Sequence, residues 1–125
     1  MPRVDTDRRL AGERAEQLAV EYLEARGVSV VLRNFRRRAG ELDIVARDGE
    51  VLSIVEVRMR TSAAFGGAAA SVDGIKRAKI VRTARQLLQR HRELARLPVR
   101  FDVVLVGALD EQPVRIEWIR HAFEA

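Results

Sequence analysis

Apolar residues recur at helical spacing in two segments of the chain. The first stripe lies between Asp7, a suitable helix cap, and Gly27, a usual helix stop, and it comprises Ala11, Ala15, Leu18, Ala19, Tyr22 and Leu23. The second stripe follows a cap at Ser71 or Asp73, and it comprises Ile80, Val81, Ala84, Leu87, Leu88, His91 and Ala95. The pattern predicts two helices, one from Asp7 to about Arg26 and one that Pro98 ends.

Short runs of strand-forming residues fill most of the remaining chain and predict five strands. They cover residues 28–34, 40–47, 51–58, 99–106 and 113–119. Asp48-Gly49 between two apolar runs is a strong hairpin signal, whereas residues 35–39 and 61–72 are expected to be loops. The run at 99–106 is apolar on both faces, so we expect it to be central in the sheet. This order of elements predicts an α/β fold with a mixed central sheet flanked by two main helices.

Length and composition narrow the class of protein. The 125 residues, 47% of them hydrophobic, suit one domain over 1–125 with loose termini at 1–7 and 124–125. The absence of cysteine excludes a disulfide scaffold, a thiolate zinc site and a cysteine nucleophile, and it fits a cytoplasmic location. The first residues are polar, which predicts no secretory signal, and no apolar run approaches the roughly 18 residues of a membrane-spanning helix.

The charge distribution suggests a polyanionic partner. The formal net charge is +5, and only two of the 23 basic residues are lysine. Residues 74–97 carry eight basic side chains against one acid, and residues 33–38 carry four arginines and no acid. Such patches favour nucleic acid. The alternative, a solvated helix face and an ordinary polar loop, is equally compatible with the charges alone.

Acidic residues gather on the predicted hairpin. With Asp48-Gly49 as the two turn residues, Asp43 faces Ile54 and Glu41 faces Glu56. Alternation then places four charged side chains on one face of the sheet, namely Glu41, Asp43, Glu56 and Arg58. Asp43 and Glu56 become diagonal neighbours, roughly 7–8 Å apart at Cα. Acids this close repel unless a divalent cation, Arg58 or a proton compensates them, and hard oxygen ligands suit Mg²⁺ or Mn²⁺.

Basic residues are expected around the same end of the hairpin, namely Arg36, Arg37, Arg38, Arg58 and Arg60. Acids that hold a metal beside arginines that attract phosphate are what metal-assisted phosphodiester hydrolysis needs. The alternative is that these charges form ordinary cross-strand ion pairs, each contributing little. Glu16 lies at the edge of the first apolar stripe, where it either reaches the hairpin acids or remains a surface glutamate.

Over about residues 8–123, the chain resembles the YraN-like family of bacterial proteins. That family is related to the restriction-endonuclease-like nucleases and to archaeal Holliday junction resolvases. The resemblance rests on motifs that occur in order, namely Gly12-x-x-Ala15-Glu16-x-x-Ala19 with Tyr22-Leu23, Arg33-Asn34-Phe35, Gly40-Glu41-Leu42-Asp43, Val55-Glu56-Val57-Arg58-x-Arg60, Phe65-Gly66, Lys76, Arg100-Phe101-Asp102-Val103-Val104 and Ala122-Phe123.

The resemblance implies an αβββαβ core with its acids on the hairpin. It implies Asp43 and Glu56 as metal ligands, completed by the carbonyl of Val57, with Glu16 as a further acid, and we expect Glu41 to support them. Lys76 is implied to meet the backbone of a nucleic acid. One position departs from the wider pattern, which ends in Glu-x-Lys, because Arg58 stands there. Arginine is effectively always charged, so it cannot act as a base, although it can neutralise charge at a phosphate.

Three functions follow as hypotheses. The first is an endonuclease dependent on Mg²⁺ or Mn²⁺ that hydrolyses phosphodiester bonds in DNA, including branched DNA. Its catalytic residues would be Glu16, Asp43, Glu56 and Arg58, and its DNA contacts Arg36, Arg37, Arg38, Arg60 and Lys76. The second is a DNA-binding module that has lost hydrolysis through Arg58. The third is a protein-interaction domain in a DNA-processing complex. The choice between a monomer and a homodimer stays open.

Overall fold

The computed structural model describes residues 3–60 and 72–125 of the chain. Its helices and strands are, in order, α1 (Arg3–Ala25), β1 (Ser29–Arg37), β2 (Gly40–Asp48), β3 (Val51–Met59), α3 (Gly74–Arg90), β4 (Val99–Val106) and β5 (Ile116–Phe123). The predicted order of elements is confirmed. The loop expected at 61–72 lies outside the described residues except for Val72, and so do Ser71 and Phe65-Gly66.

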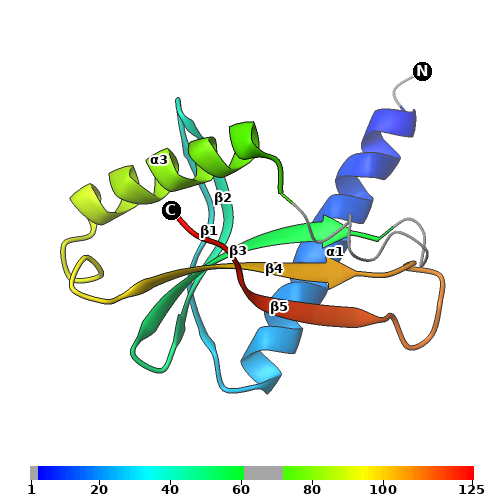
Figure 1. The fold of residues 1–125 in the computed structure, drawn as a ribbon. Helices are drawn as coiled ribbons and strands as arrows, with labels where there is room; N and C mark the ends of the chain where they lie inside the picture. Colours follow the sequence, from blue (N-terminus) through cyan, green and yellow to red (C-terminus); the bar gives the residue numbers. More distant parts are fainter. Residues whose placement is uncertain (1–2, 61–71) are drawn as a thin grey trace.

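The strands form one five-stranded sheet in the order β1-β2-β3-β4-β5 (Figure 1). Only the central pair, β3 and β4, is parallel, and the other three pairs are antiparallel. A parallel pair needs a long crossover, and α3 lies on that connection. The predicted α/β fold with a mixed sheet and two helices is therefore confirmed, and so is the central place of the strand at 99–106.

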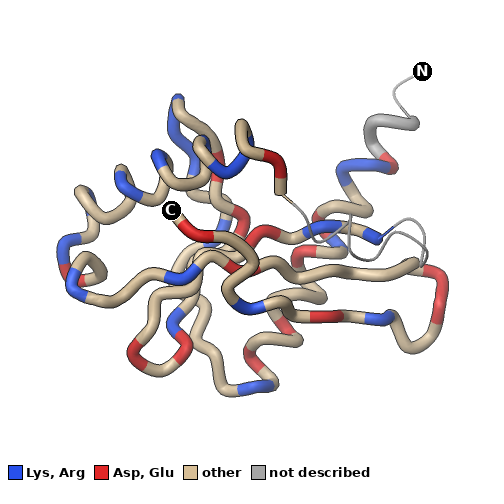
Figure 2. The backbone as a smooth tube through the Cα atoms, viewed as in Figure 1, with Lys and Arg blue, Asp and Glu red and all other residues tan. Residues whose placement is uncertain are grey.

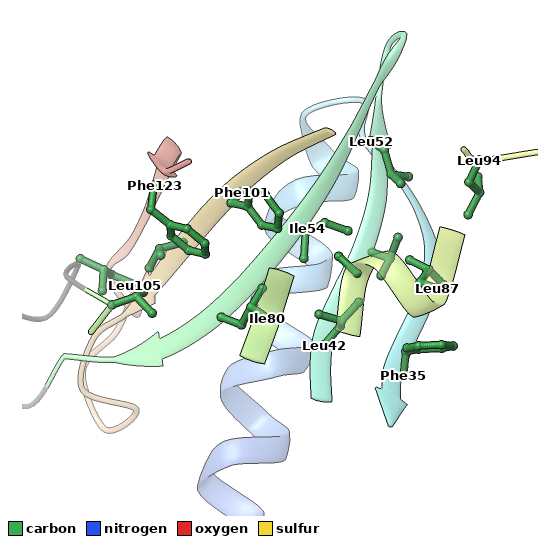
Figure 3. Packing of buried hydrophobic residues seen from close by; sticks show 14 residues of the cluster. Phe35, Leu42, Leu52, Ile54, Ile80, Leu87, Leu94, Phe101, Leu105 and Phe123 are labelled. Carbon is green, nitrogen blue, oxygen red and sulfur yellow. The ribbon is translucent and has the colours of Figure 1, made fainter. Parts of the chain in front are cut away.

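The two helices cover opposite faces of the sheet. The α3 side of the sheet buries Leu42, Ile54 and Phe101 against Ile80 and Leu87 of that helix (Figure 3). The other face buries a second cluster, in which Ala15, Ala19 and Leu23 of α1 pack on Ile44, Val55 and Val104. Both predicted apolar stripes thus supply core residues. Neither helix in the described ranges combines the length and apolar character needed to cross a bilayer.

Several predicted boundaries are wrong. The first helix begins at Arg3, so Asp7 lies inside it and is not its cap. Residues 35–37, expected in a basic loop, extend β1 because they pair with residues 40–42 of β2. The second helix has the predicted cap at Asp73 but ends at Arg90, since the following turns bury Leu94. The last strand covers Ile116–Phe123 instead of 113–119.

The register of the β2–β3 hairpin also differs from the prediction. Asp48 pairs with Val51, so Gly49 and Glu50 are the turn residues. Gly49 has a φ of 62° and takes the first turn position, where a type II′ turn requires glycine. The register moves by two residues, an even number, so the side chains of the paired residues 44–48 and 51–55 keep their predicted faces. The pairing ends at Ile44 and Val55, so Asp43 and Glu56 are the first residues beyond the paired part of the hairpin.

Candidate functional site

The candidate site lies where β2 and β3 separate. Their pairing ends at Ile44 and Val55, but β2 starts four residues earlier, at Gly40, and β3 runs on to Met59. Figure 3 shows the two strands diverging away from their turn, with Leu42 on one and Ile54 on the other. The Asp43 carboxylate occupies this opening, and its Oδ2 accepts a hydrogen bond of 2.9 Å from the backbone N–H of Val57. The carboxylate therefore takes the place of the backbone acceptor in the next hydrogen bond between the two strands.

A local twist in β1 and β2 turns side chains toward α1 at this point. Asn34, which lies across from Asp43, has a φ of 55°. As a result Arg33 and Asn34, although consecutive, both contact Glu16 on the α1 side. Alternation breaks in β2 too, because Leu42 and Val45 both belong to the α3-side cluster. Asp43, between them, lines a cleft on the α1 side.

The cleft has a volume of about 620 Å³ and is lined by residues of α1 and of the first three strands. Three of its acids are predicted site residues, namely Glu16, Glu41 and Asp43. Glu16 is held by Arg33 Nε at 3.1 Å and by Asn34 Nδ2 at 3.0 Å, and 13% of its side chain is exposed. Of the two alternatives for Glu16, the structure thus supports the one in which it reaches the hairpin acids.

Asp43 is the most perturbed acid of the site. Burial raises its pKa from the ordinary 3.8 to about 7, and the charge of Glu56 adds to the rise. The hydrogen bond from the Val57 N–H acts in the opposite direction, while Glu16 and Glu41 raise the pKa further. Three carboxyl groups, those of Glu56, Glu16 and Glu41, therefore act on Asp43 around the opening.

Glu56 faces the other side of the sheet. It follows Leu52 and Ile54 on the α3 face of β3, it is 8% exposed, and its Oε1 lies 2.8 Å from Nζ of Lys76 on α3. The prediction that Glu41, Asp43, Glu56 and Arg58 share one face is therefore wrong, because the twist turns Asp43 toward α1. The charge of Glu56 nevertheless raises the pKa of Asp43 more than the charge of any other acid does.

The predicted ring of five arginines does not form, because the strands that carry them separate. Arg36 lines the cleft and its Nε contacts Glu41 Oε2 at 3.0 Å. Arg37 lies over the ring of Phe35, with 4.3 Å from Cζ to the ring centroid, and Arg38 is exposed at the turn. Arg60 points to β5, where its Nη2 contacts Glu117 at 2.6 Å. Arg58 is half-buried on β3, beside Leu105 of β4.

The site offers few side-chain ligands for the predicted metal. Within residues 3–60 and 72–125, no three His, Cys, Asp or Glu side chains are grouped to hold a metal ion. Mg²⁺, however, is usually held by one or two carboxylates together with water and substrate phosphate. Asp43, Glu56 and the carbonyl of Val57, a residue of β3 that lines the cleft, supply hard oxygen donors of that kind. Burial and the neighbouring carboxylates raise the pKa of Asp43, and a divalent cation would offset both effects, so the residues fit such an ion.

Sequence reasoning missed two residues that shape the cleft. Arg33 and Asn34 were noted as a motif but not assigned to the site, although together they fix Glu16. A signal was available at Asn34, because an asparagine within a β-branched run is poorly suited to a strand and tolerates the left-handed conformation.

Replacing Asp43 with asparagine is expected to make the metal-free protein more stable at pH 8, with little change at pH 4. The folded-state pKa of about 7 exceeds the ordinary 3.8. Between these values the folded state retains a proton that the unfolded state has lost, so the stability of the wild type falls as the pH rises through this window. The amide oxygen of asparagine keeps the bond from Val57. Urea unfolding at both pH values measures the effect, and the exposed Asp110→Asn is the control. A gain at pH 8 no larger than at pH 4 would contradict this prediction.

Fold and site define a class of protein: an α/β domain whose mixed sheet opens at a hairpin around a group of interacting carboxylates. The chain belongs to the family described as "Uncharacterised protein family UPF0102", whose model matches residues 15–106. The resemblance to the YraN-like family is thereby confirmed. The matched span includes Glu16, Asp43, Glu56 and Lys76.

Several bacterial proteins of this family are similar to the chain over most of its length. A UPF0102 protein of Methylobacillus flagellatus is 47% identical over 114 residues, which cover 91% of this chain and 96% of the relative. A UPF0102 protein of Alkalilimnicola ehrlichii is 46% identical, and the match covers 91% of this chain and 86% of the relative. A UPF0102 protein of Pseudomonas aeruginosa is 43% identical, with coverage of 91% and 92%. These matches span the whole described site.

Proposed function

We propose that this protein is an endonuclease that uses Mg²⁺ or Mn²⁺ to hydrolyse phosphodiester bonds in DNA. The observation that carries the proposal is the pair of largely buried carboxylates in the β2–β3 opening, where burial and Glu56 raise the pKa of Asp43 to about 7. Glu16, Glu41 and Glu56 are each paired with a basic group, and positive charge beside Asp43 would offset the effects that raise its pKa. A divalent ion would supply that charge.

Asp43 and Glu56 would hold the ion, with the carbonyl of Val57 as a third oxygen. When bound, the ion supplies an activated water and neutralises charge on the phosphate. In the net reaction, water adds to phosphorus and one phosphorus–oxygen ester bond breaks, so that one new end carries a phosphate and the other a hydroxyl group. Glu16 and Glu41 support the site from α1 and from β2.

Basic residues near the opening support DNA as the substrate. Arg36 lines the cleft, and the exposed Arg38 lies at the β1–β2 turn. Figure 2 shows the basic positions of this turn close to those along α3. The backbone at Gly40 lies against that helix, because a Cβ atom there would contact Thr83 and Lys79. The basic residues of the turn and of α3 therefore form one surface, to which phosphates would be attracted, and Arg36 of this surface also lines the cleft. The resemblance of the motifs to a family related to junction resolvases makes branched DNA the first substrate to test.

A metal titration tests the proposal. Calorimetry or Mn²⁺-induced NMR relaxation is expected to show binding to the wild type and none to Asp43→Ala. Because substrate phosphate completes the shell of Mg²⁺ in many sites, the titration is repeated with a short DNA duplex. Absence of binding to the wild type in both conditions would overturn the proposal. DNA binding without metal binding would instead favour the binding module, with Arg58 in place of lysine.

A further inference from the structure

Lysine is scarce in this chain, and its two copies lie on one helix. Of the 23 basic residues, only Lys76 and Lys79 are lysine, and both lie in the first two turns of α3. The hairpin strand has Arg58 where the motif of the proposed nuclease class has lysine. A guanidinium is a planar fork, whereas an ammonium is a compact point charge on a flexible stem, so the two groups are not interchangeable at a crowded site.

The structure brings one of these lysines to the motif. Nζ of Lys76 lies 2.8 Å from Oε1 of Glu56, two residues before Arg58 on β3. The side chain of Glu56 is 9% exposed, whereas that of Lys76 is 48% exposed. The Lys76 ammonium thus pairs with a buried carboxylate while its own side chain remains accessible to solvent. Figure 2 shows the basic positions in the first turns of α3 close to acidic positions of β2 and β3.

The backbone of Lys76 is held firmly. Its N–H donates a hydrogen bond of 2.8 Å to Oδ1 of the helix cap Asp73. The cap fixes the first turn of α3, and Ile80, one turn further on, is buried in the core. The ammonium therefore extends from a fixed point toward Glu56, and its flexible stem can redirect it over a few ångströms.

We propose that Lys76 supplies from α3 the ammonium group that Glu56-x-Arg58 lacks on β3. This inference rests on the proposed function and specifies how its site is completed. Without a cation, the Lys76 ammonium balances Glu56. When a cation binds Glu56, the ammonium moves to the adjacent substrate phosphate, where it balances charge. Lys76 forms no covalent bond in this role.

Two alanine variants test the inference. Lys76→Ala and Lys79→Ala remove the same charge from neighbouring turns of the same helix, but only the first loses the contact with Glu56. Lys76→Ala is expected to bind Mn²⁺ severalfold more tightly than the wild type in the absence of DNA, because the competing ammonium is gone. Its rate of DNA cleavage is expected to fall by roughly 10–100-fold, as for other groups that act beside a metal. Lys79→Ala should show the wild-type Mn²⁺ affinity and a smaller loss of rate.

The outcomes separate this inference from the proposed function. If the wild type binds Mn²⁺ and Lys76→Ala matches Lys79→Ala in affinity and rate, the role of Lys76 is overturned and the metal site stands. If the wild type binds no metal with or without duplex, both fail. The double variant Arg58→Lys/Lys76→Ala returns lysine to β3, and it is expected to recover part of the rate. No recovery, in a variant with a wild-type circular dichroism spectrum, would contradict the equivalence of the two positions.

Discussion

Asp43→Asn is expected to abolish metal-dependent cleavage of DNA while DNA affinity changes little. The substitution removes a ligand charge but keeps the acceptor for the Val57 N–H, so the opening between β2 and β3 retains its shape. Loss of an outer-shell partner costs roughly 10–100-fold in metal affinity or activity, and loss of a direct ligand should cost more. The basic groups at the β1–β2 turn and along α3, which would bind phosphate, are untouched.

A cleavage assay on branched and linear duplexes, with Mg²⁺ or Mn²⁺ in excess, measures this effect. Gel-shift titrations of the same variant in EDTA measure DNA affinity, and Asp110→Asn is the control because it removes an exposed acid from the turn before β5. Cleavage by Asp43→Asn at the wild-type rate would show that the acids of the opening are not the catalytic centre.

Asp102→Ala is expected to lower the free energy of unfolding by about 3–5 kcal/mol, the range found when one partner of a buried ion pair is removed. Asp102 is 0% exposed. It accepts hydrogen bonds from Ser53 Oγ at 2.6 Å, from Arg100 Nη2 at 2.8 Å and from Trp118 Nε1 at 3.1 Å. Its other oxygen accepts the backbone N–H of His121, whose φ is 56°, at 2.9 Å. Truncation leaves these donors without their shared acceptor.

The pKa of Asp102 reflects this balance. Burial acts to raise it, but the hydrogen bonds, led by those from Arg100, outweigh burial and hold the pKa below its usual range. The group therefore stabilises the fold above the ordinary pKa near 4, and this contribution is lost as the pH falls through the lower folded-state value. Urea unfolding at pH 7 tests the prediction, with Asp110→Ala as the surface control. A loss below about 1 kcal/mol, the scale of a single neutral hydrogen bond, would contradict it.

Much of the fold could be predicted from local patterns. The apolar stripe at Ile80, Ala84 and Leu87 has the period of a helix, and the structure buries these three residues together. The Asp48-Gly49 signal placed the hairpin correctly, although the turn itself uses Gly49 and Glu50. Boundaries were less predictable, because β1 extends through a run of charged residues that owes its strand conformation to β2.

The site was predictable as a set of residues but not as an arrangement. Spacing and the family motif singled out Glu16, Asp43 and Glu56. In the structure, the charges of Glu16 and Glu56 both raise the pKa of Asp43. The predicted single face failed because alternation assumes a regular strand, and the left-handed Asn34 breaks that regularity across from Asp43. Similarly, Lys76 was expected to contact nucleic acid from the surface, and its contact with Glu56 links segments 20 residues apart in the sequence.

The sequence by itself determined the order of elements, the apolar stripes and the identity of the acids, because these depend on periodicity and side-chain type within short segments. The tertiary structure decided the register of the hairpin, the separation of β2 and β3, the turning of Asp43 toward α1 and the pairing of Glu56 with Lys76. Each of these depends on how distant segments pack. The crossover through α3 sets Lys76 over β3, and the twist at Asn34 directs Asp43 into the cleft.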